Sequence, residues 1–223
     1  MKSLIWKEFR LCWPILLAGA VLLIAPYIGP FIMVLRWREP WIDRTNIFAA
    51  SAIASLALSL LTLALMGGNA IACERADRSA EFLAYQPISR GRILASKFVW
   101  PIMASVVVWS INVLTISCCG RLSGPGDSET SSMLGMFFVI GLLSFSVAWL
   151  VSALQSSPTF AVASGIMAPV VIAMCFGVAM WLTDGRAFAD GTVALTAYAA
   201  IGVVVAAGSL IYGCWYYVHR VEP

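Results

Sequence analysis

The most informative property of this sequence is its lack of charge. Only 11% of its 223 residues are Asp, Glu, Lys or Arg, whereas 61% are hydrophobic. Soluble domains carry charge on roughly a quarter of their residues, so the composition excludes an ordinary soluble domain. We therefore expect an integral membrane protein that has the lipid bilayer as its solvent.

Motifs for catalysis and metal binding are also missing. The single histidine, His219, lies at the end of an apolar run, which excludes an intramembrane Ser-His pair, an H-E-x-x-H motif and a histidine-rich metal site. The lysines of the sequence are Lys2, Lys7 and Lys97, and none of them belongs to a G-x-x-x-x-G-K-[ST] phosphate loop. The six cysteines show no C-x-x-C spacing. We predict no catalytic residue, no metal site and no cofactor in this chain.

Six apolar runs are long enough to cross a bilayer, since a helical span needs about 20 residues to cross about 30 Å of hydrocarbon. The expected spans are residues 14–35, 47–72, 98–119, 132–154, 160–182 and 193–218. Each is continuously apolar rather than alternating, which favours helices over a transmembrane barrel. The fold class is therefore an all-α integral membrane protein, with one transmembrane domain over residues 1–223.

None of these six spans contains a charged residue. Intramembrane charges cost at least about 2.5 kcal/mol and are typical of proton or ion coupling, so an ion-coupled carrier is disfavoured. The strongest polar groups are Asn69 and Asn112, together with Ser55, Ser59, Thr62, Ser105, Ser110, Thr115, Ser144 and Ser146. We expect these groups to form hydrogen bonds between helices. Lining a translocation pathway is the alternative.

The distribution of Lys and Arg predicts the orientation in the membrane. One side carries Lys2, Lys7, Arg10, Arg75, Arg78, Arg90, Arg92, Lys97 and Arg220, and the other carries Arg36, Arg38, Arg44, Arg121 and Arg186. The excess on the first side places both termini in the cytoplasm and the protein in the cytoplasmic (inner) membrane, although Arg36, Arg38 and Arg44 oppose this orientation.

The N-terminal residues 1–13 have the pattern of an amphipathic helix in the headgroup region. On a helical wheel one face carries Ile5, Trp6, Phe9, Cys12 and Trp13, and the other carries Lys7, Glu8 and Arg10. Pro14 would let the chain turn into the first span. The alternative is a charged leader that only sets topology.

The segment 73–97 is the one long charged segment on the cytoplasmic side. Residues 79–86 are long enough for about two helical turns, which Pro87 would end. Phe82 and Leu83 give this helix an apolar surface, and its charges are of both signs. A hairpin that lies on anionic lipid is the alternative, but its acidic residues would be repelled there. Mixed charge favours docking onto another protein.

Several motifs in this segment resemble those of a known family. Glu74, then Glu81-Phe82-Leu83, Pro87-Ile88-Ser89-Arg90 and Lys97, resemble the coupling loop of bacterial type-2 ATP-binding-cassette (ABC) transporter permeases. The leading MKSLIWKEFR is similar to the N-terminal elbow helix of that family. The resemblance implies a six-helix permease whose coupling helix, between spans 2 and 3, docks on a separate ATPase. The residues expected at that interface are Glu74, Arg75, Asp77, Arg78, Glu81, Phe82, Leu83 and Arg90.

The resemblance also implies the partners. Two copies of an ABC ATPase subunit would bind ATP and Mg²⁺, and a second permease copy or a paralogue would complete a dimer that exports a substrate. No nucleic acid partner is expected. The competing hypothesis is an accessory membrane subunit that anchors another complex and uses the charged segment as a static dock.

Small residues recur every four positions in the fifth span, at Ala161, Gly165, Pro169, Ala173 and Gly177. This spacing lets two helices approach closely in lipid. We predict that the stripe contributes to the dimer interface beside the first span. Packing within one subunit is the alternative.

Overall fold

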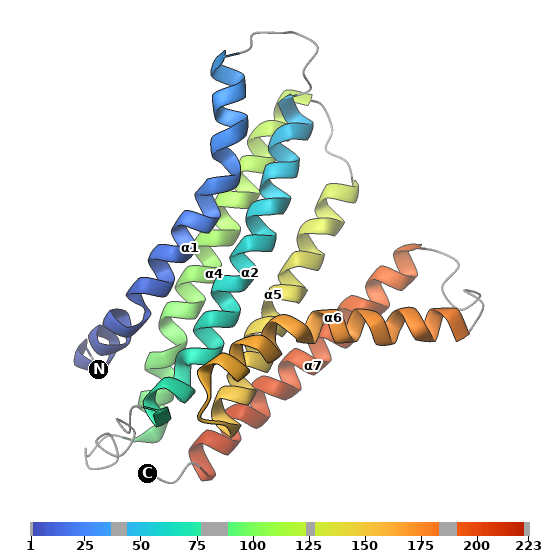
Figure 1. Ribbon diagram of the computed structural model, residues 1–223. Coiled ribbons are helices and arrows are strands. Elements are labelled where there is room, and N and C mark those ends of the chain that lie inside the picture. Colours follow the sequence, from blue (N-terminus) through green and yellow to red (C-terminus); the bar gives the residue numbers. More distant parts are fainter. Residues whose placement is uncertain (1, 37–43, 77–88, 124–127, 183–190, 221–223) are drawn as a thin grey trace.

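The computed structural model describes residues 2–36, 44–76, 89–123, 128–182 and 191–220 (Figure 1). These residues form α-helices and short connections, and no strand occurs among them. The helices are α1 (Lys2–Arg36), α2 (Arg44–Ala76), α4 (Arg90–Ser123), α5 (Ser128–Leu154), α6 (Pro158–Leu182) and α7 (Gly191–His219).

The six predicted spans are confirmed, because each of these helices is long and apolar enough to cross a membrane. The helices extend beyond the apolar runs at several ends, since α1 begins at Lys2 and α4 at Arg90. Continuing the helix satisfies backbone N–H and C=O groups near the membrane surface. Charge therefore marks the end of a hydrophobic run without marking the end of its helix.

Helix α1 is continuous from Lys2 to Arg36 with Pro14 inside it, so the helix does not end at that proline. A change in the direction of the chain at Pro14 stays a prediction. A proline inside a helix removes one backbone hydrogen bond but does not always end the helix. The position of residues 1–13 in the headgroup region stays a prediction.

Helices α2 and α5 form the centre of the bundle. Helices α1 and α4 pack against α2, while α6 packs against both central helices and α7 packs mainly against α5. Figure 1 shows α6 strongly inclined to α1, α2, α4 and α5. The largest apolar core joins Ile71, Ile93, Phe145, Trp149 and Tyr217. It lies toward the end of the bundle where α2 ends and α4 begins.

Glycine permits the closest helix contacts. A Cβ atom on Gly67 of α2 would lie 2.6 Å from the carbonyl oxygen of Phe145 in α5, and one on Gly68 would lie 2.8 Å from the backbone nitrogen of Val162 in α6. Neither backbone atom can move without its helix, so these positions have no room for a side chain. The Gly67-Gly68 pair therefore lets α2 contact two helices at backbone distance.

Gly67→Ala is expected to lower the free energy of unfolding by about 1–3 kcal/mol, because the added methyl group overpacks the contact with α5. Gly208→Ala in α7 is the matched control, since nothing lies within 4 Å of its Cβ position and alanine favours a helix over glycine. Thermal unfolding of the purified protein, followed by circular dichroism, measures both. Equal stability of the two variants would contradict this packing.

Candidate functional site

The residues that flank the charged segment lie at the end of the bundle where α1 begins and α7 ends, which we call the terminal end (Figure 1). Helix α2 ends there at Ala76, and α4 begins there at Arg90. The carbonyl of Ser89 accepts the backbone N–H of Arg92 at 2.9 Å, which makes Ser89 the N-cap residue of α4.

The predicted ATPase-facing residues divide into two groups. Glu74 and Arg75 lie in the last turn of α2, and Arg90 is the first residue of α4. The remaining residues, Asp77, Arg78, Glu81, Phe82 and Leu83, lie outside the described residues, as does the expected coupling helix. Their role at an interface stays a prediction.

A cluster of four charged side chains joins three helices at the terminal end. Glu74 of α2 accepts from Lys7 of α1 at 2.8 Å and from Lys97 of α4 at 2.9 Å. Lys97 also lies 3.4 Å from Glu8 of α1. Three of the four residues are buried, and Lys7 is partly exposed. We call Lys7, Glu8, Glu74 and Lys97 the ion cluster.

Lys97 occupies the centre of the ion cluster, with only 3% of its surface exposed. Its ammonium group has three N–H donors, and three acceptors surround it. Besides the two glutamates, Lys97 Nζ donates to the carbonyl of Ala70 at 2.6 Å. A buried charge is costly unless it is paired and hydrogen-bonded. The ion cluster meets that condition, because its two positive charges balance its two negative charges and each N–H donor of Lys97 has an acceptor.

Two arginines connect the ends of the charged segment to α5 and α7. Arg75 Nη1 donates to the carbonyl of Ala153 at 2.9 Å, and Arg90 Nη1 donates to the carbonyl of Val218 at 2.8 Å. Both acceptors lie in the last turn of their helices. Carbonyls at a helix C-terminus lack intrahelical donors and carry partial negative charge. Each arginine therefore caps a helix while linking it to the segment.

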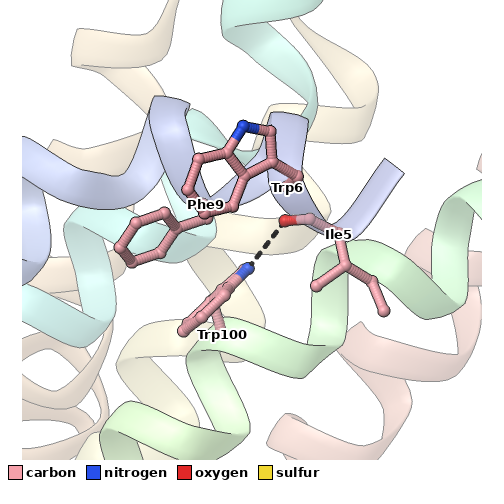
Figure 2. Close-up of a pocket in the computed structure, with 4 residues that line it drawn as sticks. All are labelled: Ile5, Trp6, Phe9 and Trp100. Atoms are coloured by element: carbon pink, nitrogen blue, oxygen red, sulfur yellow. Dashed lines mark hydrogen bonds between the residues drawn. The ribbon is translucent and has the colours of Figure 1, made fainter. Parts of the chain in front are cut away.

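The start of α1 is held against α4 by aromatic side chains (Figure 2). The indole nitrogen of Trp100 donates to the carbonyl of Ile5 at 3.2 Å. The rings of Phe9 and Trp100 have centroids 4.7 Å apart. Beside the ion cluster, these contacts give α1 a second attachment to the helix that follows the charged segment.

The polar groups in the spans mostly bond within their own helices. Asn112 is fully buried and accepts from the Tyr27 hydroxyl at 2.7 Å, and Ser55 donates to the carbonyl of Leu23 at 2.8 Å. These two bonds connect α1 with α4 and α2, as expected. Donation to the carbonyl four residues earlier instead occurs at Ser59, Asn69, Ser105, Thr115 and Ser146. A pathway role for Asn69 and Asn112 stays a prediction.

The small-residue stripe of α6 has two parts. Ala161, Gly165 and Pro169 are buried inside the subunit, and a Cβ atom on Gly165 would lie 2.6 Å from the Ser144 carbonyl of α5. Ala173 and Gly177 are exposed. The first part packs within the subunit, and the second is the surface that a dimer contact would use.

Sequence reasoning did not find the ion cluster. Glu8 was expected on the polar face of the first helix, away from the apolar side chains, yet it is 5% exposed and lies inside the protein. Lys97 was predicted as the end of the charged cytoplasmic segment 73–97, and it is buried as well. The available signal was that acidic and basic residues flank three different spans at the same end. Only the helix packing shows that they meet.

The fold and the terminal end define a multi-pass α-helical membrane protein whose sequence has no phosphate loop of its own. The chain matches the model of the ABC-2 family transporter proteins over residues 7–180, and it belongs to that family. The resemblance to a type-2 ABC permease is thereby confirmed. No curated protein and no solved structure gives a significant match to this chain.

Proposed function

We propose that this chain is the permease half of an ABC exporter in the cytoplasmic membrane. Two copies, or this chain and a paralogue, would form the transmembrane pathway. Two separate ATPase subunits would bind ATP and Mg²⁺ and would dock on the segment 77–88 from the cytoplasm. Both termini of the permease would lie on that side.

The observation that supports this function most directly is the attachment of both ends of the segment to the bundle. Glu74 and Lys97 hold α2, α4 and α1 together, and Arg75 and Arg90 reach α5 and α7. A displacement of the segment by an ATPase would therefore act on five helices at once. A loop that only sets topology has no need for such connections.

The uncharged spans favour an amphipathic substrate. A translocation path between such helices offers apolar surface and neutral hydrogen-bonding groups, and it offers no fixed charge to an ion. The energy for transport must then come from the ATPase rather than from a proton or cation gradient.

The test is reconstitution of this chain with a separate ABC ATPase subunit. An exporter requires that the ATPase co-purifies with the chain and that vesicles containing both accumulate an amphipathic fluorescent substrate when ATP is added outside. An accessory anchor would bind the ATPase without ATP-dependent accumulation, and this result would refute the proposal. A Walker-A lysine variant of the ATPase is the matched control.

The exposed part of the α6 stripe leads to a prediction about the dimer. In a background without native cysteines, Gly177→Cys is expected to form an intermolecular crosslink in membranes, because Gly177 has nothing within 4 Å of its Cβ position in its own subunit and small residues favour close helix contacts. Gly208→Cys on α7 is equally open and serves as the control. A crosslink at Gly208 but not at Gly177 would place the interface elsewhere.

A further inference from the structure

A groove between the start of α1 and α4 has no part in the proposed coupling. It has a volume of about 260 Å³ and is lined by Ile5, Trp6, Phe9 and Trp100. Figure 2 shows that three of these residues come from α1 and that Trp100 lies across from them on α4. The Trp100 N–H is bonded to the Ile5 carbonyl. The groove is therefore an apolar, largely aromatic surface whose two sides are fixed to each other.

The groove lies between helices that are poorly covered by the rest of the protein. Only 11% of the most apolar stretch of α1, and 11% of that of α4, is buried inside the subunit. Trp6 and Trp13, on the same part of α1, are both more than half exposed. Tryptophan is enriched where a membrane protein meets the headgroup region. The groove is thus in a position to contact lipid.

A cation lies at the edge of the groove. The guanidinium carbon of Arg10 is 5.9 Å from the centre of the Trp6 ring, within the range of a cation–π contact. Side chains on a helix point back toward its N-terminus, so Arg10 reaches toward the terminal end while its helix continues into the membrane. This geometry places a positive charge over the Trp6 ring, at the edge of the groove.

The exposed charges at the terminal end favour an anion, and Arg10 is the one placed against a residue of the groove. Among the residues that the structure describes at the terminal end, the acidic side chains are Glu8 and Glu74, and both are buried in the ion cluster. The exposed charged side chains described there are those of Arg10, Arg90, Arg92 and Arg220. Anionic headgroups attract such cations, whereas a zwitterionic headgroup gains less from them.

We propose that this groove binds one anionic phospholipid per subunit. An acyl chain lies against Phe9 and Trp100, and the headgroup phosphate accepts hydrogen bonds from Arg10. Burial of hydrocarbon against aromatic rings supplies affinity, and the guanidinium distinguishes an anionic headgroup from a zwitterionic one. The site depends neither on the ATPase nor on transport.

Native mass spectrometry of the full chain tests the site. The protein is equilibrated with phosphatidylglycerol or with phosphatidylcholine of the same acyl chains, and the lipid that remains bound to each subunit is counted. We expect one phosphatidylglycerol to be retained in preference to phosphatidylcholine. Arg10→Gln should lower that retention about fivefold. Trp6→Leu should lower it less, because it keeps the cation and an apolar side chain in the lining while it removes the aromatic contact of Arg10. Arg220→Gln removes an equal charge from the end of α7 and should leave retention unchanged.

Three results would overturn the proposal. Equal retention of the two lipids by the unaltered chain would show that the groove does not select an anion. Equal losses for Arg10→Gln and Arg220→Gln would show only a diffuse charge effect. An efficient crosslink between two copies carrying Trp6→Cys, in a background without native cysteines, would show that a second subunit covers the groove.

Discussion

Replacing Lys97 with methionine is expected to lower the free energy of unfolding by about 3–5 kcal/mol. The substitution keeps most of the side-chain volume but removes the ammonium group that contacts Glu74 and Glu8. Both carboxylates are buried, and only Lys7 would remain to balance them. Thermal or denaturant unfolding in detergent, followed by circular dichroism, measures the loss.

A triple variant separates the ion cluster from general damage to the core. Combining Lys97→Met with Glu8→Gln and Glu74→Gln removes the unpaired charges, so it should be more stable than Lys97→Met alone. Lys7 retains its charge there, but it is 35% exposed and can reach water. Arg220→Gln, an exposed charge at the same end, should change stability by no more than about 0.5 kcal/mol. A triple variant less stable than the single one would contradict the electrostatic explanation.

Phe82→Ala is expected to weaken binding of the ATPase by at least about 2 kcal/mol, which is the usual cost of truncating a buried interface anchor. Glu81→Lys should weaken it in a salt-dependent way, because a charge near the rim acts mainly through long-range attraction. Neither change should alter membrane insertion or helix content. Co-purification of the ATPase with each variant, at low and high salt, is the measurement.

The alternative, in which the segment is a hairpin that only sets topology, predicts the opposite effects for these variants. In that case the positive charges matter, so Arg92→Glu should disturb insertion, while Phe82→Ala should be silent. Arg92 is a better probe of topology than Arg90, because Arg90 also donates to the carbonyl of Val218. Unchanged co-purification and transport with both Phe82→Ala and Glu81→Lys would refute docking through this segment.

The six spans could be predicted from the sequence because hydrophobic length is a local property of the chain. Twenty apolar residues must form a helix in lipid whatever their neighbours are. Pro14 is an equally local signal that does not by itself decide where a helix ends, because proline disfavours a helix without excluding it. In α1 the contacts with α4 through Ile5, Phe9 and Trp100 support the helix on the N-terminal side of that proline.

The candidate site was predictable in part. The sequence placed Glu74, Arg75 and Arg90 between the apolar runs that end at residue 72 and begin at residue 98, and the structure places them in the last turn of α2 and at the start of α4. The pairing within the ion cluster could not be predicted from the sequence. Glu8 and Lys97, for example, are separated by 89 residues and meet only because their helices pack together. The α6 stripe shows the same limit. Its spacing indicated a close helix contact, but only the structure distinguishes buried Gly165 from exposed Gly177.

The hydrogen-bond acceptors of Arg75 and Arg90 affect which amino acids can be substituted at the contacting positions in related proteins. Both arginines bond to main-chain carbonyls, at positions 153 and 218, and every amino acid supplies such a carbonyl. Substitutions at 153 and 218 therefore need no compensating change at 75 and 90. In an alignment of relatives, the contacts among Lys7, Glu8, Glu74 and Lys97 should appear as positions that change together. The contacts of Arg75 with α5 and of Arg90 with α7 should not appear in this way.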